Sequence, residues 1–280
     1  AMSPGFVAAL AVGATQLPAA AVPVTGLEPG YIMSDSILDD AATMNADAIQ
    51  AVLNAKGTGC VPAAGSTCLK AYVESTPSRA SDALCTGAYG GAANETAAQI
   101  IAKVATACGI NPQVIIVILQ KEQSLVTATA GKSAATYARA LGFCCPDSTP
   151  GVCDPQNAGF ANQVYSAAKQ FKRYAANPTG YSYRAGMTNT ILWNPDPSCG
   201  SSSVFIENQA TASLYNYTPY RPNAAALAAG SGTGDACSSY GHRNFHLYFR
   251  DWFGPATQRA PVGVVEAGGD TAPSYIGGAA

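Results

Sequence analysis

The most hydrophobic helical segment of the chain follows Asn111 and Pro112, residue types that favour the N-cap and the first position of an α-helix. Lys121 is predicted to point away from the apolar face of this helix, whereas Glu122 lies on it. A carboxylate on an apolar face is costly unless it has a partner or a function. The apolar residues that share the face with Glu122 at helical spacing are Ile115, Ile118, Leu119, Leu125 and Val126.

Similar spacing predicts several further helices. The first begins after Asn45 and stops at Gly57, and the second is expected to be capped by Asn94 and closed by Gly109. A hairpin is expected within 181–193 and a short strand at 203–206. These patterns predict a mostly α protein of the α+β class with a minor β part. The other expected helices span 160–174, 209–217, 223–229 and 243–253.

The two ends of the chain differ from its middle in composition. Residues 1–27 are rich in Ala, Pro, Val and Gly, and 5–14 resemble the apolar core of a signal peptide, although a basic segment before it is missing. We therefore expect 1–27 to be a signal-peptide remnant or a flexible extension, and the Pro/Gly/Ala-rich 255–280 to be a flexible linker. The folded domain is expected at 28–254, and no segment resembles a membrane span.

Charge is scarce in this chain. Charged residues make up 11% of its 280 residues, against about 25% in typical proteins, and the net charge is −2. No basic patch indicates nucleic acid or an anionic lipid surface as a partner. A neutral surface rich in hydroxyl and amide groups suits an uncharged carbohydrate, and it suits an inert secreted protein equally well. The sequence leaves the oligomeric state open.

Nine cysteines are spread along the chain without paired CxxC motifs, which favours disulfides in an oxidising compartment over a zinc ribbon. Spacing alone does not fix the pairing, and local bridges are the simplest arrangement. One thiol remains, and we assign it to Cys144, although spacing does not decide between Cys144 and its neighbour Cys145. The expected pairs are Cys60 with Cys68, Cys85 with Cys108, Cys145 with Cys153, and Cys199 with Cys237.

Glu122 is the main candidate for chemistry. Burial on an apolar face is expected to raise the pKa of a carboxyl above its usual value of about 4.3, which would make it a proton donor near neutral pH. Lysozyme is the standard worked example of this effect in a glycosidase. The alternative is a structural carboxylate at the end of the buried stretch, reaching solvent or paired with an Arg.

The run 116–125, IVILQKEQSL, resembles the catalytic helix of lysozyme-like transglycosylases and bacterial glucosaminidases. Residues 137–143, YARALGF, are similar to the loop that follows it in those families. The resemblance covers about 94–175 and implies a lysozyme-like fold in which Glu122 cleaves a glycan. The segment 208–220 resembles secreted actinobacterial surface proteins described as hemagglutinin-like. A lysozyme-like domain needs no cofactor, and its expected partner is peptidoglycan or another cell-wall polysaccharide.

A second carboxylate would decide the chemistry, because inverting and retaining glycosidases use two. Asp147 and Asp154 are the nearest candidates downstream of Glu122, and both also fit ordinary turn chemistry beside Pro or Gly. If neither reaches the cleft, Glu122 acts first as acid and then as base, as in the transglycosylases that the segment resembles.

Aromatic residues suggest where a sugar would bind, since flat rings beside amide and hydroxyl groups stack on and hydrogen-bond to sugars. For each single ring, packing in the core is the competing explanation. The candidates are Tyr137, Tyr215, Tyr217 and Tyr220, with Tyr181, Tyr183 and Trp193 as a second possible wall.

Other chemistries are less well supported. His242 and His246 have the i,i+4 spacing of zinc ligands, but the Glu of an HExxH motif is missing, so no metal is expected. Nothing near Cys144 indicates an activated thiol. The sequence therefore predicts a secreted glycan-cleaving enzyme that uses Glu122, or alternatively a non-catalytic adhesin or glycan-binding module on the same scaffold.

Overall fold

The computed structural model describes residues 21–144 and 154–258. Of these, 42% are helical and 11% are in strands, which confirms a mixed protein in which helix dominates. The longer helices are α2 (Ala46–Lys56), α3 (Ala97–Cys108), α4 (Pro112–Gln123), α6 (Phe160–Ala176), α7 (Gln209–Tyr217) and α9 (Gly241–Phe253). The shorter ones are α1 (Asp35–Leu38), α5 (Ala134–Tyr137), α8 (Ala224–Ala228), η1 (Leu69–Ala71), η2 (Pro155–Asn157) and η3 (Pro197–Cys199).

Helix ends follow their capping chemistry. Asn111 caps α4 by accepting a hydrogen bond from the Gln113 amide, as predicted. The prediction that Asn94 caps α3 is wrong by two residues. The cap is Thr96, which forms a capping box with Gln99, and Gly109 ends the helix at φ 63°. The side chain of each of Thr96 and Gln99 accepts a hydrogen bond from the backbone N–H of the other. The prediction of Asn94 as the cap did not take this pair into account.

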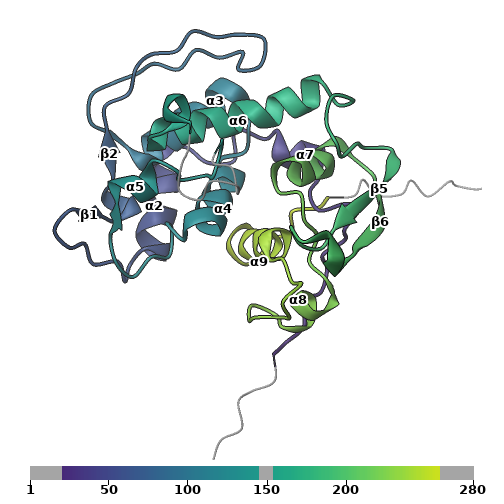
Figure 1. Ribbon diagram of the computed structural model, residues 1–280. Coiled ribbons are helices and arrows are strands. Elements are labelled where there is room, and N and C mark those ends of the chain that lie inside the picture. Colours follow the sequence, from purple (N-terminus) through teal and green to yellow (C-terminus); the bar gives the residue numbers. More distant parts are fainter. Residues whose placement is uncertain (1–20, 145–153, 259–280) are drawn as a thin grey trace, which may run out of the picture.

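Helix α4 lies at the centre of the molecule. Every residue from Val114 to Gln120 is buried, and the helix packs against α3 and α9. Helix α6 packs against α3 on one side and α7 on the other. In Figure 1, α2, α3 and α5 lie on one side of the molecule, and α7, α8 and the β5–β6 hairpin lie on the other. Because it is enclosed from several directions, α4 has no continuous polar face.

The described strands form three small antiparallel sheets. Strand β5 (Met187–Leu192) pairs with β6 (Ser201–Ile206), so the expected strand at 203–206 is confirmed and slightly longer. The hairpin expected within 181–193 is wrong, because 181–186 form a turn in which the Asn189 amide bonds both the Arg184 N–H and its carbonyl. The other strands are β1 (Ser66–Thr67) with β4 (Lys132–Ser133), and β2 (Val73–Glu74) with β3 (Glu95–Thr96).

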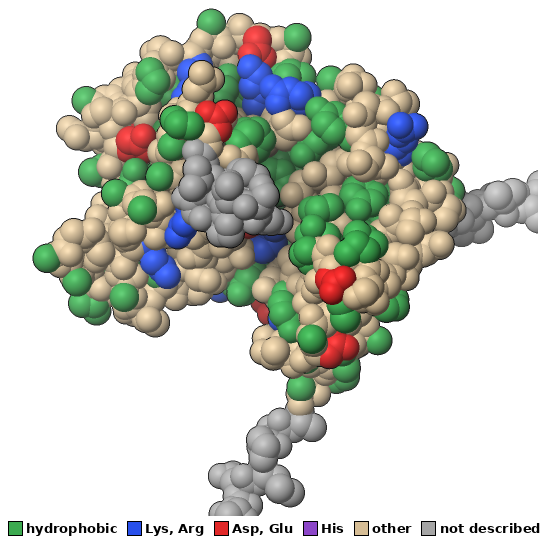
Figure 2. All heavy atoms as spheres, in the orientation of Figure 1, with side chains coloured by type: hydrophobic (Ala, Val, Ile, Leu, Met, Phe, Trp, Pro, Cys, Tyr) green, Lys and Arg blue, Asp and Glu red, His purple; other side chains and the backbone are tan. Residues whose placement is uncertain are grey.

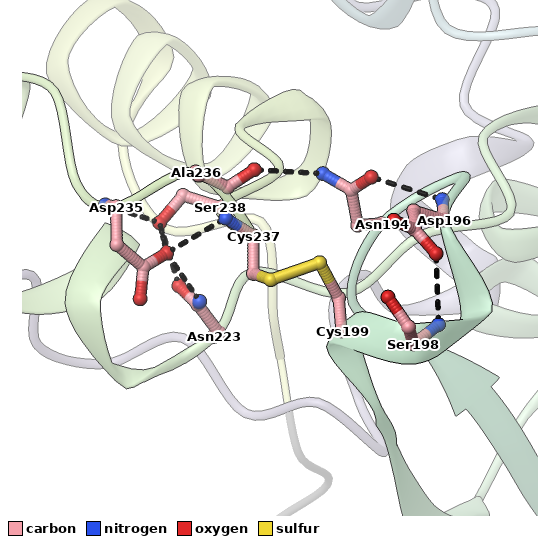
Figure 3. The surroundings of a disulfide bond; sticks show 9 residues. All are labelled: Asn194, Asp196, Ser198, Cys199, Asn223, Asp235, Ala236, Cys237 and Ser238. Atoms are coloured by element: carbon pink, nitrogen blue, oxygen red, sulfur yellow. Dashed lines mark hydrogen bonds between the residues drawn. A yellow bond between two sulfur atoms is a disulfide. The ribbon is translucent and has the colours of Figure 1, made fainter.

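Three disulfides lie within the described residues, and their pairing agrees with the prediction. They join Cys60 to Cys68, Cys85 to Cys108, and Cys199 to Cys237. The last one ties the β5–β6 connection to the loop before α9, and hydrogen-bonded turns flank it on both sides (Figure 3). The predicted Cys145–Cys153 bridge lies outside the described residues.

The packed body extends beyond 28–254. The Val24 amide donates to the Leu227 carbonyl at 2.9 Å, and the Ser34 amide donates to the Ala256 carbonyl at 3.0 Å. The described residues on both sides of the expected boundaries therefore belong to the fold. Among the helices in 21–144 and 154–258, none has the length and apolar character needed to cross a bilayer.

Candidate functional site

Glu122 lies in the last turn of α4, where the buried helix reaches the surface. The helix ends because Ser124 adopts the left-handed conformation, with φ 50°. Gln120 fixes the next segment, since its Oε1 accepts hydrogen bonds from the amides of Val126 and Thr127, each at 3.0 Å. The side chain of Glu122 is 27% exposed, so it is not fully enclosed by the core.

Lys121 does not point into solvent, as the helical pattern predicted. Its side chain is only 8% exposed, and its ammonium contacts both the Glu122 carboxylate and, at 2.9 Å, the Thr218 hydroxyl. The prediction fails because α9 and the end of α7 cover this side of α4. The ammonium stabilises the negative charge of a carboxylate that lies at the unfavourable, C-terminal end of a helix dipole.

Gly142 forms the opposite wall of the Glu122 site. A Cβ atom built on Gly142 would lie 3.1 Å from Glu122 Oε2, closer than ordinary contacts, and the glycine has φ 71°. Both the space and the backbone conformation therefore favour glycine at this position. The backbone of the 141–143 turn consequently approaches the carboxylate more closely than a side chain would permit.

The 141–143 turn is held from α6 by one buried amide. Gln163 Oε1 accepts hydrogen bonds from the Leu141 and Phe143 amides at 3.2 and 3.1 Å. Its Nε2 donates to the carbonyls of Phe143 and Asn157 at 2.9 and 2.7 Å. One fully buried side chain thus satisfies four backbone groups and fixes the turn beside Glu122.

Tyr217 holds the same turn from α7. Its hydroxyl donates to the Leu141 carbonyl at 2.7 Å, and its ring stacks on Phe171 with centroids 5.1 Å apart. Burial, and then the Glu122 carboxylate, raise the pKa of Tyr217 well above its usual range. The phenol therefore stays protonated and keeps its role as a donor near Glu122.

Of the two candidates for a second carboxylate, the structure describes only Asp154. Asp154 caps η2, where its side chain accepts hydrogen bonds from the Gln156 amide at 2.9 Å and the Asn157 side chain at 3.3 Å. This is the turn chemistry that was its competing explanation. The Asp154 amide also donates to the Cys144 carbonyl. Asp147 lies outside the described residues.

The four tyrosines predicted to line a sugar site have different positions. Tyr137 and Tyr215 are core residues with 2% and 1% exposure, and their hydroxyls donate to the carbonyls of Thr67 and Pro29. Their assignment to the wall of a sugar site is therefore corrected, because neither ring presents a face to a ligand. Tyr217 borders Glu122, and Tyr220 is partly exposed beside Leu192 at the end of β5.

Cys144 is a free and exposed thiol, as assigned from the sequence. Burial of its sulfur atom, and then the nearby Asp154 carboxylate, raise its pKa, while Arg173 acts in the opposite direction. A thiol with a raised pKa is a poor nucleophile at neutral pH. Nucleophilic catalysis by Cys144 therefore has no support from its surroundings.

The two histidines anchor loops. His242 Nε2 lies 2.8 Å from the Thr218 carbonyl, and His246 Nε2 lies 3.0 Å from the Thr25 carbonyl. Each ring is therefore engaged with a different segment packed on α9. Within 21–144 and 154–258, no group of three or more His, Cys, Asp or Glu side chains is arranged to hold a metal ion.

The sequence patterns did not reveal three residues around Glu122. Lys121 was assigned to the solvent side, and Gly142 and Gln163 were not singled out. Gly142 stands in the YARALGF segment that resembles a family loop, which was the one available signal. Gln163 looks like an ordinary polar residue of an amphipathic helix, and only the packing of α6 against the turn shows its function.

Comparisons with known proteins add no relative. No family model, no curated protein and no solved structure matches this chain.

Proposed function

We propose that the chain is a secreted enzyme with a lysozyme-like domain that cleaves β-1,4 linkages in peptidoglycan, with Glu122 as its acid and base. The observation that supports this best is the position of Glu122. Its side chain lies at the end of a buried helix and is partly exposed, and its carboxylate lies against the 141–143 turn, which Gln163 and Tyr217 hold in place. A carboxyl group that transfers protons needs both access to substrate and a fixed position.

In the proposed reaction, the Glu122 carboxyl group donates its proton to the glycosidic oxygen while the bond from this oxygen to the anomeric carbon breaks. The resulting carboxylate then removes a proton from the group that attacks that carbon. This group is either water, which gives a hydrolysed reducing end, or the 6-hydroxyl of the same sugar, which closes an anhydro ring. The second route needs no second carboxylate.

The proposed reaction requires the contact between Lys121 and Glu122 to open when the substrate binds. The Lys121 ammonium contacts the same Glu122 carboxylate that has to reach the glycosidic oxygen in the proposed reaction. The Thr218 hydroxyl is a second partner for the same ammonium. In the proposed enzyme, an entering sugar separates Lys121 from Glu122 and leaves the ammonium on Thr218.

The alternative function is a non-catalytic adhesin or glycan-binding module on the same scaffold. The Lys121–Glu122 ion pair favours this alternative, since a permanently paired carboxylate is a structural group. The surface is compatible with either function, because uncharged side chains cover most of the face seen in Figure 2. The three described disulfides and the absence of a membrane-spanning helix among the described residues are compatible with a secreted protein.

Product analysis tests the proposed reaction. Purified protein is incubated with insoluble peptidoglycan, and the soluble fragments are analysed by mass spectrometry. We expect disaccharide-peptide fragments, and the presence or absence of an anhydro ring identifies the attacking group. An adhesin would bind the material and release no fragments.

A further inference from the structure

A pocket that does not include Glu122 lies along one face of α9. Its volume is about 360 Å³, within the range of small-molecule sites, and residues 22–25 and 230–231 form its other walls. The face of α9 that lines it follows helical spacing, with Asn244, Leu247, Tyr248 and Asp251 in one stripe. Neither Glu122 nor any residue of the 141–143 turn contributes to it.

The wall formed by residues 22–25 is fixed in place. The Val24 amide donates to the Leu227 carbonyl at 2.9 Å, and His246 bonds the Thr25 carbonyl at 3.0 Å. Gly230 permits the close approach of the two walls, since a Cβ atom there would lie 2.5 Å from the Val22 carbonyl oxygen. The pocket is therefore preformed, which lowers the entropic cost of binding.

The polar side chains of the pocket retain hydrogen-bond donors and acceptors that can bind a ligand. Asn244 Oδ1 accepts two hydrogen bonds from Arg243, which leaves the Asn244 amide nitrogen as a donor. Asp251 Oδ1 accepts from Arg250, which leaves Oδ2 as an acceptor. The Tyr248 hydroxyl has no hydrogen bond to another described residue, and it both donates and accepts.

Charge and shape narrow the class of ligand. Arg250 and Asp251 pair with each other, so the pocket carries no uncompensated charge that would select an ion. The Tyr248 ring contacts the Trp252 ring, with centroids 5.2 Å apart. Together with Leu247, the flat Tyr248 ring contributes apolar surface to the lining of the pocket. A flat ring surrounded by donors and acceptors matches a sugar, whose C–H face stacks while its hydroxyls form hydrogen bonds.

We propose that this pocket binds a neutral mono- or disaccharide unit, as a glycan-binding site separate from Glu122. Asn244, Tyr248 and Asp251 provide the hydrogen bonds, and the Tyr248 ring provides the stacking surface. The site binds its ligand whether or not Glu122 is catalytic, so this proposal and the proposed function fail independently.

Trp252 serves as the reporter for the test. The chain has two tryptophans, and Trp193→Phe leaves Trp252 as the only one. The probes are N-acetylglucosamine, its β-1,4-linked dimer and maltose, each titrated to millimolar concentration while tryptophan fluorescence and heat of binding are recorded. We expect saturable binding of at least one sugar with a change in Trp252 fluorescence.

Conservative variants locate the binding. Tyr248→Phe and Asp251→Asn each remove one hydrogen-bonding group, and each is expected to weaken binding by about tenfold. Asp47→Asn, which changes an exposed carboxylate on α2, is expected to leave binding unchanged. The proposal is overturned if no sugar binds, or if both pocket variants bind the sugar as strongly as the wild type does.

Discussion

The Glu122 carboxylate lies close against the backbone of Gly142: a Cβ atom on Gly142 would lie 3.1 Å from Glu122 Oε2, so any side chain there would push against the carboxylate. The contact joins the end of α4 to a turn that comes 20 residues later, and that turn is tied to α6 and α7. The position of Glu122 thus depends on α6 and α7 as well as on its own helix, α4.

Gly142→Ala is therefore expected to disturb Glu122 as well as the backbone. A non-glycine residue at φ 71° costs about 1–2 kcal/mol, and the added methyl group also pushes against the carboxylate. Gly186→Ala is the matched control, because Gly186 has φ 74° and open space around a Cβ. In the proposed enzyme, both variants lose stability in chemical denaturation, and Gly142→Ala alone loses glycan cleavage. Equal activity of the two variants would contradict this account of the contact.

Gln163→Leu tests whether one amide holds the turn. The substitution removes the Gln163 hydrogen bonds of four backbone groups, one buried and three partly buried, and a buried group left unpaired costs about 1–3 kcal/mol if no water replaces the amide. We expect a loss of at least about 3 kcal/mol in the free energy of unfolding, with faster hydrogen exchange at the amides of Leu141 and Phe143. Gln113→Leu, at a partly buried position of α4, is the control. If Gln163→Leu lowered the free energy of unfolding no more than the control does, the turn would keep its conformation without the Gln163 amide.

The sequence predicted the helices well, because their signals are local. Local signals located both ends of α2 and α7 and the start of α4 to within a residue, whereas α4 ends at Gln123, before Leu125 and Val126, which helical spacing assigned to its face. Exposure within α4 was not predictable in the same way. Hydrophobic periodicity assigned Lys121 to solvent, whereas the packing of α9 and Thr218 covers it. The contacts of Glu122 come from distant segments, and a pattern within one helix does not contain that information.

Acid is expected to weaken the fold through Glu95. Burial alone would raise the pKa of this carboxyl, but hydrogen bonds from Lys103, Thr76 and Tyr89 outweigh burial and lower it. The stabilisation is therefore complete above about pH 4.3, the usual value for Glu, and is lost as the pH falls through the folded-state value. Glu95→Gln should be less stable at pH 7 and less sensitive to acid below pH 4.3. Unfolding curves with an unchanged pH dependence would exclude Glu95 as a contributor.

His242 is expected to act in a higher pH window. Burial, and then the Lys121 ammonium, lower its pKa to about 3, whereas an unfolded histidine has a pKa of about 6.5. The unfolded chain takes up a proton first, so stability is complete above about pH 6.5 and declines between pH 6.5 and 3 by up to several kcal/mol. His242→Gln, which keeps a donor for the Thr218 carbonyl, should flatten this decline. NMR titration of the His242 ring, showing protonation near pH 6.5 in the folded protein, would contradict the assignment.

The most direct test of the central claim compares the rate of fragment release from peptidoglycan by the wild type and by Glu122→Gln. Removing a general acid costs about 10²–10⁴-fold in rate, so the variant should release almost nothing while it retains the unfolding curve of the wild type. Asp47→Asn, at an exposed carboxylate of α2, is the control and should match the wild type. A wild type that releases no fragments, or a Glu122→Gln variant that releases them at an equal rate, would contradict the assignment of Glu122 as the acid.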